Sequence, residues 1–90
     1  MAWHVYIVVT EKGKFYTGIS TDVERRFIEH MTGLGGAKAL KGDPAAALVY
    51  VEDAADRSSA SIRESEIKKL TRRQKEELVA QFQSLSSSFS

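Results

Sequence analysis

The pattern of apolar and polar positions predicts two short strands near the start of the chain. Residues 3–10, "WHVYIVVT", are rich in the β-branched and aromatic side chains that are typical of a strand. The segment "EKGK" then provides a turn, and residues 14–19, "KFYTGI", form a second strand-like run. Gly13 can adopt the positive φ that a tight turn requires. This part of the chain therefore predicts a β-hairpin.

A helix is predicted directly after the hairpin. Thr21 is a suitable N-cap, and Glu24, three residues later, completes a capping box. Apolar residues then recur every four positions, at Val23, Phe27 and Met31, until the glycines begin. We therefore expect an amphipathic helix whose buried stripe consists of these three side chains.

A loop and a third strand follow the first helix. Residues 33–44, "GLGGAKALKGDP", contain four glycines and the only proline of the chain, a composition that is typical of a loop. Residues 46–53, "AALVYVED", predict a strand. The pattern alone does not fix whether this strand is parallel or antiparallel to the hairpin.

The remainder of the chain predicts two helices. The first begins at Ser58 and runs to about Leu70, and the second is opened by a capping-box pattern at Thr71 and Gln74. Their expected buried residues are Ala60, Ile62, Ile67 and Leu70 in the first helix, and Leu78, Phe82 and Leu85 in the second. Each set is expected to pack on the sheet.

The order strand, strand, helix, strand, helix, helix predicts a small α+β domain. A chain of 90 residues is too short for two hydrophobic cores, so we expect one domain over residues 1–83. Residues 84–90, "SLSSSFS", are low in complexity and are expected to form a disordered tail.

The composition excludes several classes of protein. Apolar residues make up 42% and charged residues 28% of the chain, as in a globular rather than a disordered protein. There is no cysteine, which excludes disulfides, thiolate metal sites and cysteine nucleophiles and suits a reducing compartment. The apolar run "VYIVV" is too short to span a bilayer and lacks the flanks of a signal peptide. We therefore expect a cytoplasmic protein without membrane contact.

Positive charge is concentrated in one region, although the net charge is only +1. Residues 67–75 contain five cations and no acid: Lys68, Lys69, Arg72, Arg73 and Lys75. Lys38 and Lys41 add charge in the glycine-rich loop. These side chains could hold phosphates. The alternative is a solvated helix end, in which cations complement the helix dipole, and charge alone favours this alternative.

Four residues with useful chemistry are predicted to lie near one another. Arg26 and His30 are one helical turn apart beside the apolar stripe, and Tyr6 and Tyr16 lie on the two hairpin strands. A tight hairpin brings both phenols close to the start of the helix. The simpler interpretation is that the tyrosines and the histidine are packing residues and that Gly18 is a bend before the helix.

The sequence resembles the GIY-YIG nucleases. "VYI" at residues 5–7, followed ten residues later by "YTG" at residues 16–18, is similar to the paired motif that names this family. The resemblance continues through "TDVERRFIEH", "LVYVE" and "RSSASIRESEIKKLTR" and covers residues 3–78. It is strongest to the small stand-alone members. It implies a three-stranded antiparallel sheet flanked by helices, and hydrolysis of phosphodiesters with one divalent metal, Mg²⁺ or Mn²⁺.

The resemblance also implies a role for each candidate residue. Tyr6 helps to activate the attacking water and Tyr16 is the second phenol of the site, with Gly18 as the structural turn of the motif. Arg26 stabilises charge on the phosphate, His30 accepts or donates a proton, and Glu64 is the only protein ligand of the metal. A guanidinium can bind two phosphate oxygens at once, and Mg²⁺ keeps most of its waters, so this set is chemically reasonable.

The choice of Glu64 depends on the resemblance. The apolar pattern of its helix leaves Glu64 and Glu66 equally able to border the buried face, whereas relatives tend to have a small residue at the second position. Three features depart from the family pattern. His4 replaces the glycine of the first motif, Ile19 stands where some members have a lysine, and the chain has no asparagine.

The sequence therefore predicts a metal-dependent endonuclease-like domain that acts on DNA, guided by the structure of its substrate. RNA is an alternative partner, and a further protein could supply the choice of target. Two other functions remain open. One is a non-catalytic nucleic-acid-binding module on the same scaffold, and the other is a protein-interaction domain in which the tyrosines only pack.

Overall fold

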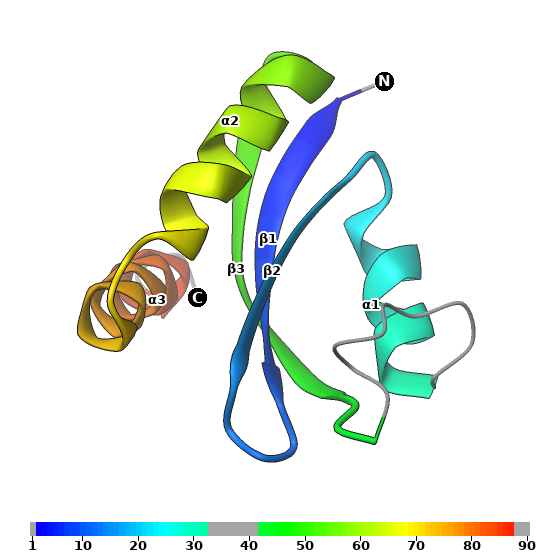
Figure 1. Ribbon diagram of the computed structural model, residues 1–90, viewed down its shortest axis with the longest axis vertical. Helices are drawn as coiled ribbons and strands as arrows, with labels where there is room; N and C mark the ends of the chain where they lie inside the picture. Colours follow the sequence, from blue (N-terminus) through cyan, green and yellow to red (C-terminus); the bar gives the residue numbers. More distant parts are fainter. Residues whose placement is uncertain (1, 33–41, 88–90) are drawn as a thin grey trace.

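The computed structural model describes residues 2–32 and 42–87 and has the expected order of elements (Figure 1). The elements are β1 (Trp3–Thr10), β2 (Phe15–Ser20), α1 (Val23–Thr32), β3 (Ala45–Ala54), α2 (Arg57–Lys68) and α3 (Arg72–Ser87). The strands form one sheet in the order β2-β1-β3. Both neighbours of β1 run antiparallel to it, so the direction that the sequence pattern left open is settled. The prediction of an α+β fold is confirmed.

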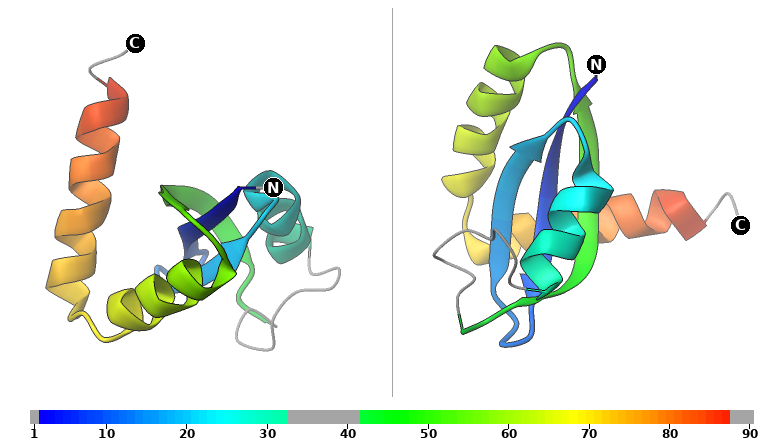
Figure 2. Two further views of the ribbon diagram at one scale, coloured as in Figure 1. Left: turned by 90° about the horizontal axis from the view of Figure 1, so that it is seen from above. Right: turned by 90° about the vertical axis from the view of Figure 1, so that its right-hand side faces the viewer.

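The helices cover the two faces of the sheet. Figure 1 shows α1 on one face and α2 and α3 on the other. Alternation along β1 supplies both interfaces, because Val5 and Ile7 pack with Ile67 of α2 while Tyr6 packs with Phe27 of α1. Figure 2 shows that α3 runs across the strands and that its last turns extend beyond the sheet. This central strand therefore directs the candidate tyrosine towards the helix that carries the arginine and the histidine.

The turns and helix ends follow the local chemistry of the sequence. Gly13 has a φ of +83° in the hairpin turn, as predicted. The capping box of α3 is also confirmed, since the Thr71 backbone N–H donates to the Gln74 side chain at 2.9 Å and the Gln74 N–H to the Thr71 hydroxyl at 3.2 Å. The predicted cap of α1 is wrong. Asp22, not Thr21, accepts the first free N–H, from Arg25 at 3.1 Å.

The predicted stripe of α1 is wrong at its last position. Met31 is exposed, and His30 occupies the buried place instead. A four-residue step overshoots one helical turn by about 40°, so Met31 has rotated about 80° away from Val23, whereas His30 lies within about 20° of it. The same geometry buries Ala60 and Ile67 in α2. A spacing of seven residues, not four, therefore marks the buried line of both helices.

Other boundaries differ slightly from expectation. Helix α2 begins at Arg57 after Asp56, whose side chain accepts the Ser59 N–H, and Ile62 is exposed. Helix α3 continues to Ser87, so residues 84–87 are helical rather than part of a disordered tail. Val79 is its buried residue among the side chains described up to residue 84, and the predicted Leu85 side chain lies outside them. None of the helices within residues 2–32 and 42–87 is long and apolar enough to cross a membrane.

Candidate active site

A buried tyrosine–histidine pair forms the centre of the site. The Tyr6 hydroxyl and His30 Nε2 lie 2.8 Å apart, and each residue is only 1% exposed. Tyr16 contacts the same imidazole edge-on, with ring centroids 5.2 Å apart. In the hairpin register Tyr16 lies opposite Val8, two positions from Tyr6 on the same face of the sheet. Two strands and α1 therefore bring both phenols to one histidine.

The space for this pair is provided by Gly18. Gly18 lies opposite Tyr6 within β2, and a Cβ atom built on it would lie 2.6 Å from the Tyr6 hydroxyl oxygen and 2.7 Å from Cζ. Such distances are shorter than real Cβ contacts allow. The expectation that Gly18 turns the chain is wrong, because the residue sits inside an extended strand. The absence of a Cβ atom at this position leaves room for the Tyr6 ring beside the neighbouring strand.

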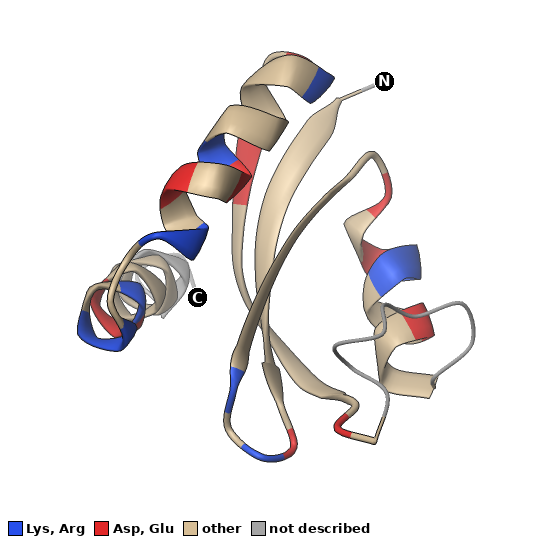
Figure 3. Cartoon of the chain, in the orientation of Figure 1, with Lys and Arg blue, Asp and Glu red and all other residues tan. Residues whose placement is uncertain are grey.

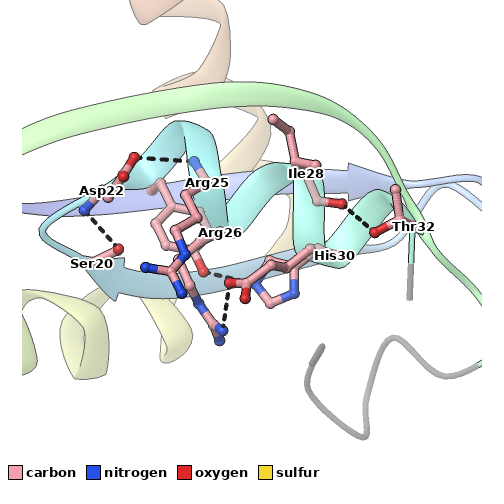
Figure 4. Close-up of polar contacts among 9 residues, drawn as sticks. Ser20, Asp22, Arg25, Arg26, Ile28, His30 and Thr32 are labelled. Carbon is pink, nitrogen blue, oxygen red and sulfur yellow. Dashed lines mark hydrogen bonds and ion pairs between the residues drawn. The ribbon is translucent and has the colours of Figure 1, made fainter. Parts of the chain in front are cut away.

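Arg26 lies beside the buried pair and is held by a neighbour. Figure 4 shows Arg26 and His30 projecting from α1 on the same side of the helix. Arg26 Nη1 donates to the Glu29 carboxylate at 3.1 Å. Sequence reasoning did not find Glu29. The available signal was its spacing of three residues from Arg26, which places the two side chains on one helix face.

The electrostatics of the site keep the Tyr6 phenol neutral. Burial raises the pKa of Tyr6 above its ordinary value of 10.0, and Tyr16 and Glu64 add to this effect. The guanidinium of Arg26 opposes it through its charge and hydrogen bonding. The phenol is therefore a weaker acid than free tyrosine, and it would need both Arg26 and a proton acceptor to act as a base.

Glu64 lies on α2, which packs on the opposite face of the sheet from Tyr6 and α1. Helix α2 packs against β2, the edge strand, and against β1. The Glu64 side chain is 25% exposed, pairs with Lys68 at 3.6 Å, and its charge contributes to the raised pKa of Tyr6. Glu66 is 61% exposed and pairs with Arg63 at 3.7 Å. Of the two carboxylates that the sequence pattern left open, Glu64 is the less exposed one, and its charge helps to raise the pKa of Tyr6.

His30 is predicted to be neutral at neutral pH. Burial lowers the pKa of His30 below its ordinary value of 6.5, the charge of Arg26 lowers it further, and Glu29 opposes both effects. Nδ1 of His30 is also buried and has no hydrogen-bond partner within the described residues. Protonation would therefore place a charge in a site that does not solvate it.

This lowered pKa predicts a pH-dependent stability. Between the pKa of folded His30 and 6.5, the unfolded chain binds more protons than the folded protein, so the free energy of unfolding falls as the pH decreases through this window. The stability that neutral His30 contributes to the folded protein is fully present above pH 6.5. Denaturant titrations between about pH 7.5 and about pH 5 should show a smaller loss for His30→Gln than for the unmodified protein.

The ring resonances of His30 provide the direct check. The chain has only two histidines, so the spectrum of His4→Gln assigns the signal of His30. The imidazole shift of His30 should titrate with a midpoint below 6.5, and a midpoint at or above 6.5 would show that burial does not control this group.

The cluster of cations near the start of α3 is partly occupied by structural contacts. Lys68, Arg72 and Arg73 pair with Glu64, Glu76 and Glu77 respectively. Figure 3 shows positive and negative residues side by side along the beginning of α3. That Lys68, Lys69, Arg72, Arg73 and Lys75 bind nucleic acid stays a prediction, and Lys38 and Lys41 lie outside the described residues.

Arg72 has a clear structural use. Its guanidinium carbon lies 4.0 Å from the centre of the Phe15 ring, and Nη1 donates to the Gly13 carbonyl at 2.7 Å. The side chain thereby fastens α3 to the hairpin. A phosphate at Arg72 would have to use the N–H donors that these contacts leave free, or displace the contacts.

A family model and several relatives match most of this chain. The family model described as "GIY-YIG catalytic domain" matches residues 2–77. The UPF0213 protein YhbQ of Escherichia coli (strain K12) is 49% identical over 79 residues, which cover 88% of this chain and 78% of that protein. The UPF0213 protein Ent638_3592 of Enterobacter sp. (strain 638) is 50% identical over 80 residues, covering 89% and 78%.

Two solved structures share the fold. The solution NMR structure of the UPF0213 protein BH0048 from Bacillus halodurans has a TM-score of 0.55 and 38% identity, over 89% of this chain and 84% of that chain. The solution NMR structure of EF2693 from E. faecalis has a TM-score of 0.60 and 34% identity, over 92% and 88%.

Proposed function

Because the chain belongs to the GIY-YIG catalytic domain family, a family of nucleases, we propose that it hydrolyses phosphodiester bonds in DNA with one divalent metal ion, Mg²⁺ or Mn²⁺. The observation that carries this proposal is the contact between the Tyr6 hydroxyl and His30 Nε2 at 2.8 Å, with the charges of Arg26 and Glu64 both acting on the phenol. Groups from both faces of the sheet would then act on one phosphate.

Arg26 would bind the phosphate that is attacked. Its side chain is 35% exposed, so a substrate can reach it, while the buried phenol lies next to it. A planar guanidinium presents parallel N–H donors that match two phosphate oxygens. Charge accumulates on these oxygens in the transition state, where Arg26 would stabilise it.

Tyr6 and His30 would move the proton of the attacking water. The neutral imidazole, in the tautomer with an unprotonated Nε2, can accept the hydroxyl proton of Tyr6 across the 2.8 Å contact. The phenol in turn takes a proton from the water as the water attacks phosphorus. The lowered pKa of His30 keeps the imidazole in its accepting form at neutral pH.

Glu64 would hold the metal. No group of three or more histidine, aspartate or glutamate residues capable of holding a metal occurs in the parts of the chain that the structure describes. One carboxylate suits Mg²⁺, which keeps several waters and takes further oxygens from a substrate phosphate. The bound ion supplies charge neutralisation at the phosphate. Glu64 must first release Lys68, with which it forms a weak pair at 3.6 Å.

Cleavage of plasmid and branched DNA in the presence of Mg²⁺ or Mn²⁺ tests the proposal. We expect nicking by the purified protein and a loss of about a hundredfold to a thousandfold in Arg26→Ala, because the main stabiliser of the phosphate charge is removed. Arg25→Ala is the matched control, since Arg25 is the neighbouring, exposed arginine of the same helix. Nicking that persists in Arg26→Ala would point to a contaminant or to a different site.

A non-catalytic nucleic-acid-binding module is the second candidate. It is favoured by the burial of Tyr6, because this residue is only 1% exposed. This function predicts binding of DNA or RNA that weakens steeply with salt, and no cleavage with either metal. The same purified protein distinguishes the two functions when binding and nicking are measured together.

A further inference from the structure

The contact between Arg26 and Glu29 occupies the group that the proposed function assigns to the phosphate. Arg26 Nη1 lies 3.1 Å from Glu29 Oε1, and the two side chains are 35% and 26% exposed. A carboxylate and a phosphodiester both present anionic oxygens to a guanidinium. The position of the Glu29 carboxylate on Arg26 is therefore also a position that an incoming phosphate oxygen could take.

We propose that Glu29 is an internal competitor of the substrate phosphate at Arg26. The inference rests on the proposed role of Arg26 as a phosphate ligand and adds a determinant of specificity to it. An isolated anion must displace Glu29 and gains little, because it replaces one charged contact with another. A nucleic acid carries further phosphates that interact with other cations, so it can displace Glu29 more readily.

The charges around Arg26 indicate that Glu29 competes with a bound phosphate and does not merely hold Arg26 in position. With Glu29 in place, the groups near Arg26 are the Glu29 carboxylate, the neutral Tyr6 phenol and the buried His30 imidazole. A phosphate that binds to Arg26 would therefore meet a like charge on Glu29 unless this carboxylate moves. Glu29 lies on the surface of α1, so its side chain can rotate towards solvent without disturbing the buried pair.

Binding of inorganic phosphate to Glu29→Gln tests the inference without reference to cleavage. Glutamine keeps the size of the side chain and removes its charge, so we expect phosphate to bind about two- to fivefold more tightly, as fits the usual strength of a partly exposed ion pair. The gain should vanish in Arg26→Ala/Glu29→Gln. Calorimetry or amide chemical shifts at one low ionic strength provide the measurement.

Glu66→Gln is the matched control. It removes the same charge from an Arg63–Glu66 pair at 3.7 Å, which has the same i,i+3 spacing on α2, and it should leave phosphate affinity unchanged. Equal tightening in both variants would reduce the effect to net charge and overturn the inference. Weaker phosphate binding in Glu29→Gln would show that Glu29 positions Arg26. Absence of phosphate binding in this variant would show that there is no competition at Arg26. Either result would overturn the inference. Tighter phosphate binding in Glu29→Gln together with no DNA cleavage would support the competition at Arg26 and contradict the proposed hydrolysis.

Discussion

Replacing Gly18 with alanine is expected to destabilise the protein by about 2–3 kcal/mol, the upper range for overpacking in a core. The new Cβ would lie 2.6 Å from the hydroxyl oxygen of Tyr6 and 2.7 Å from Cζ. The ring cannot swing away, because Tyr6 is fully buried between β2 and α1 and is tied to His30. The free energy of unfolding, measured by urea titration, should fall, and the contact between Tyr6 and His30 should be lost.

Combining Gly18→Ala with a substitution of Tyr6 separates the clash between the new Cβ and the Tyr6 ring from other effects of the alanine. In a Tyr6→Phe background the oxygen is gone but Cζ remains 2.7 Å away, so Gly18→Ala should still destabilise the protein. In a Tyr6→Val background the ring is absent and the same change should cost much less. Such non-additivity is expected of residues in direct contact. An equal cost in the Tyr6→Val background would show that the ring is not what requires glycine.

Replacing Glu64 with glutamine is expected to reduce metal-dependent cleavage by about a hundredfold or more. A metal ion contributes several kcal/mol to the stabilisation of charge at a phosphate, and each 1.36 kcal/mol corresponds to a factor of ten in rate. Glutamine keeps the shape of the side chain but presents a neutral oxygen that binds Mg²⁺ or Mn²⁺ poorly. The half-saturating concentration of Mn²⁺ in the nicking assay should rise together with the loss in rate.

Glu66→Gln controls for the loss of one acidic charge from α2. Glu66 is more exposed than Glu64 and pairs with Arg63 at 3.7 Å, so its replacement should leave both the rate and the dependence on Mn²⁺ close to those of the unmodified protein. A larger loss of cleavage in Glu66→Gln than in Glu64→Gln would show that Glu66, not Glu64, holds the metal.

The fold could be predicted from the sequence because its local signals agree with one another. Strand composition, the glycine turn at Gly13 and the Thr71 capping box all define elements that the structure contains. The main error concerned which residues of α1 face the sheet. A step of four predicted Met31 on the buried line of α1, whereas the true helical period places His30 there.

The candidate site was predictable only in part. Alternation along β1 and the one-turn spacing of Arg26 and His30 were enough to expect that a phenol, a guanidinium and an imidazole meet. The need for glycine at position 18 depends on the exact pairing of the strands, which the pattern does not define. The distinction between Glu64 and Glu66 depends on how α2 lies along β2, and a helix of weak amphipathicity does not reveal this.

The most direct measurement of whether Arg26 and Glu64 act on the same phosphate is the rate of DNA cleavage by Arg26→Ala, Glu64→Gln and the double variant. The rates are compared at a protein concentration at which each single variant still cleaves above background. If the two groups stabilise one transition state as a unit, the double variant should be about as slow as the slower single variant. A rate reduced by the product of the two single losses would mean that the guanidinium and the carboxylate act independently, and it would contradict a shared site.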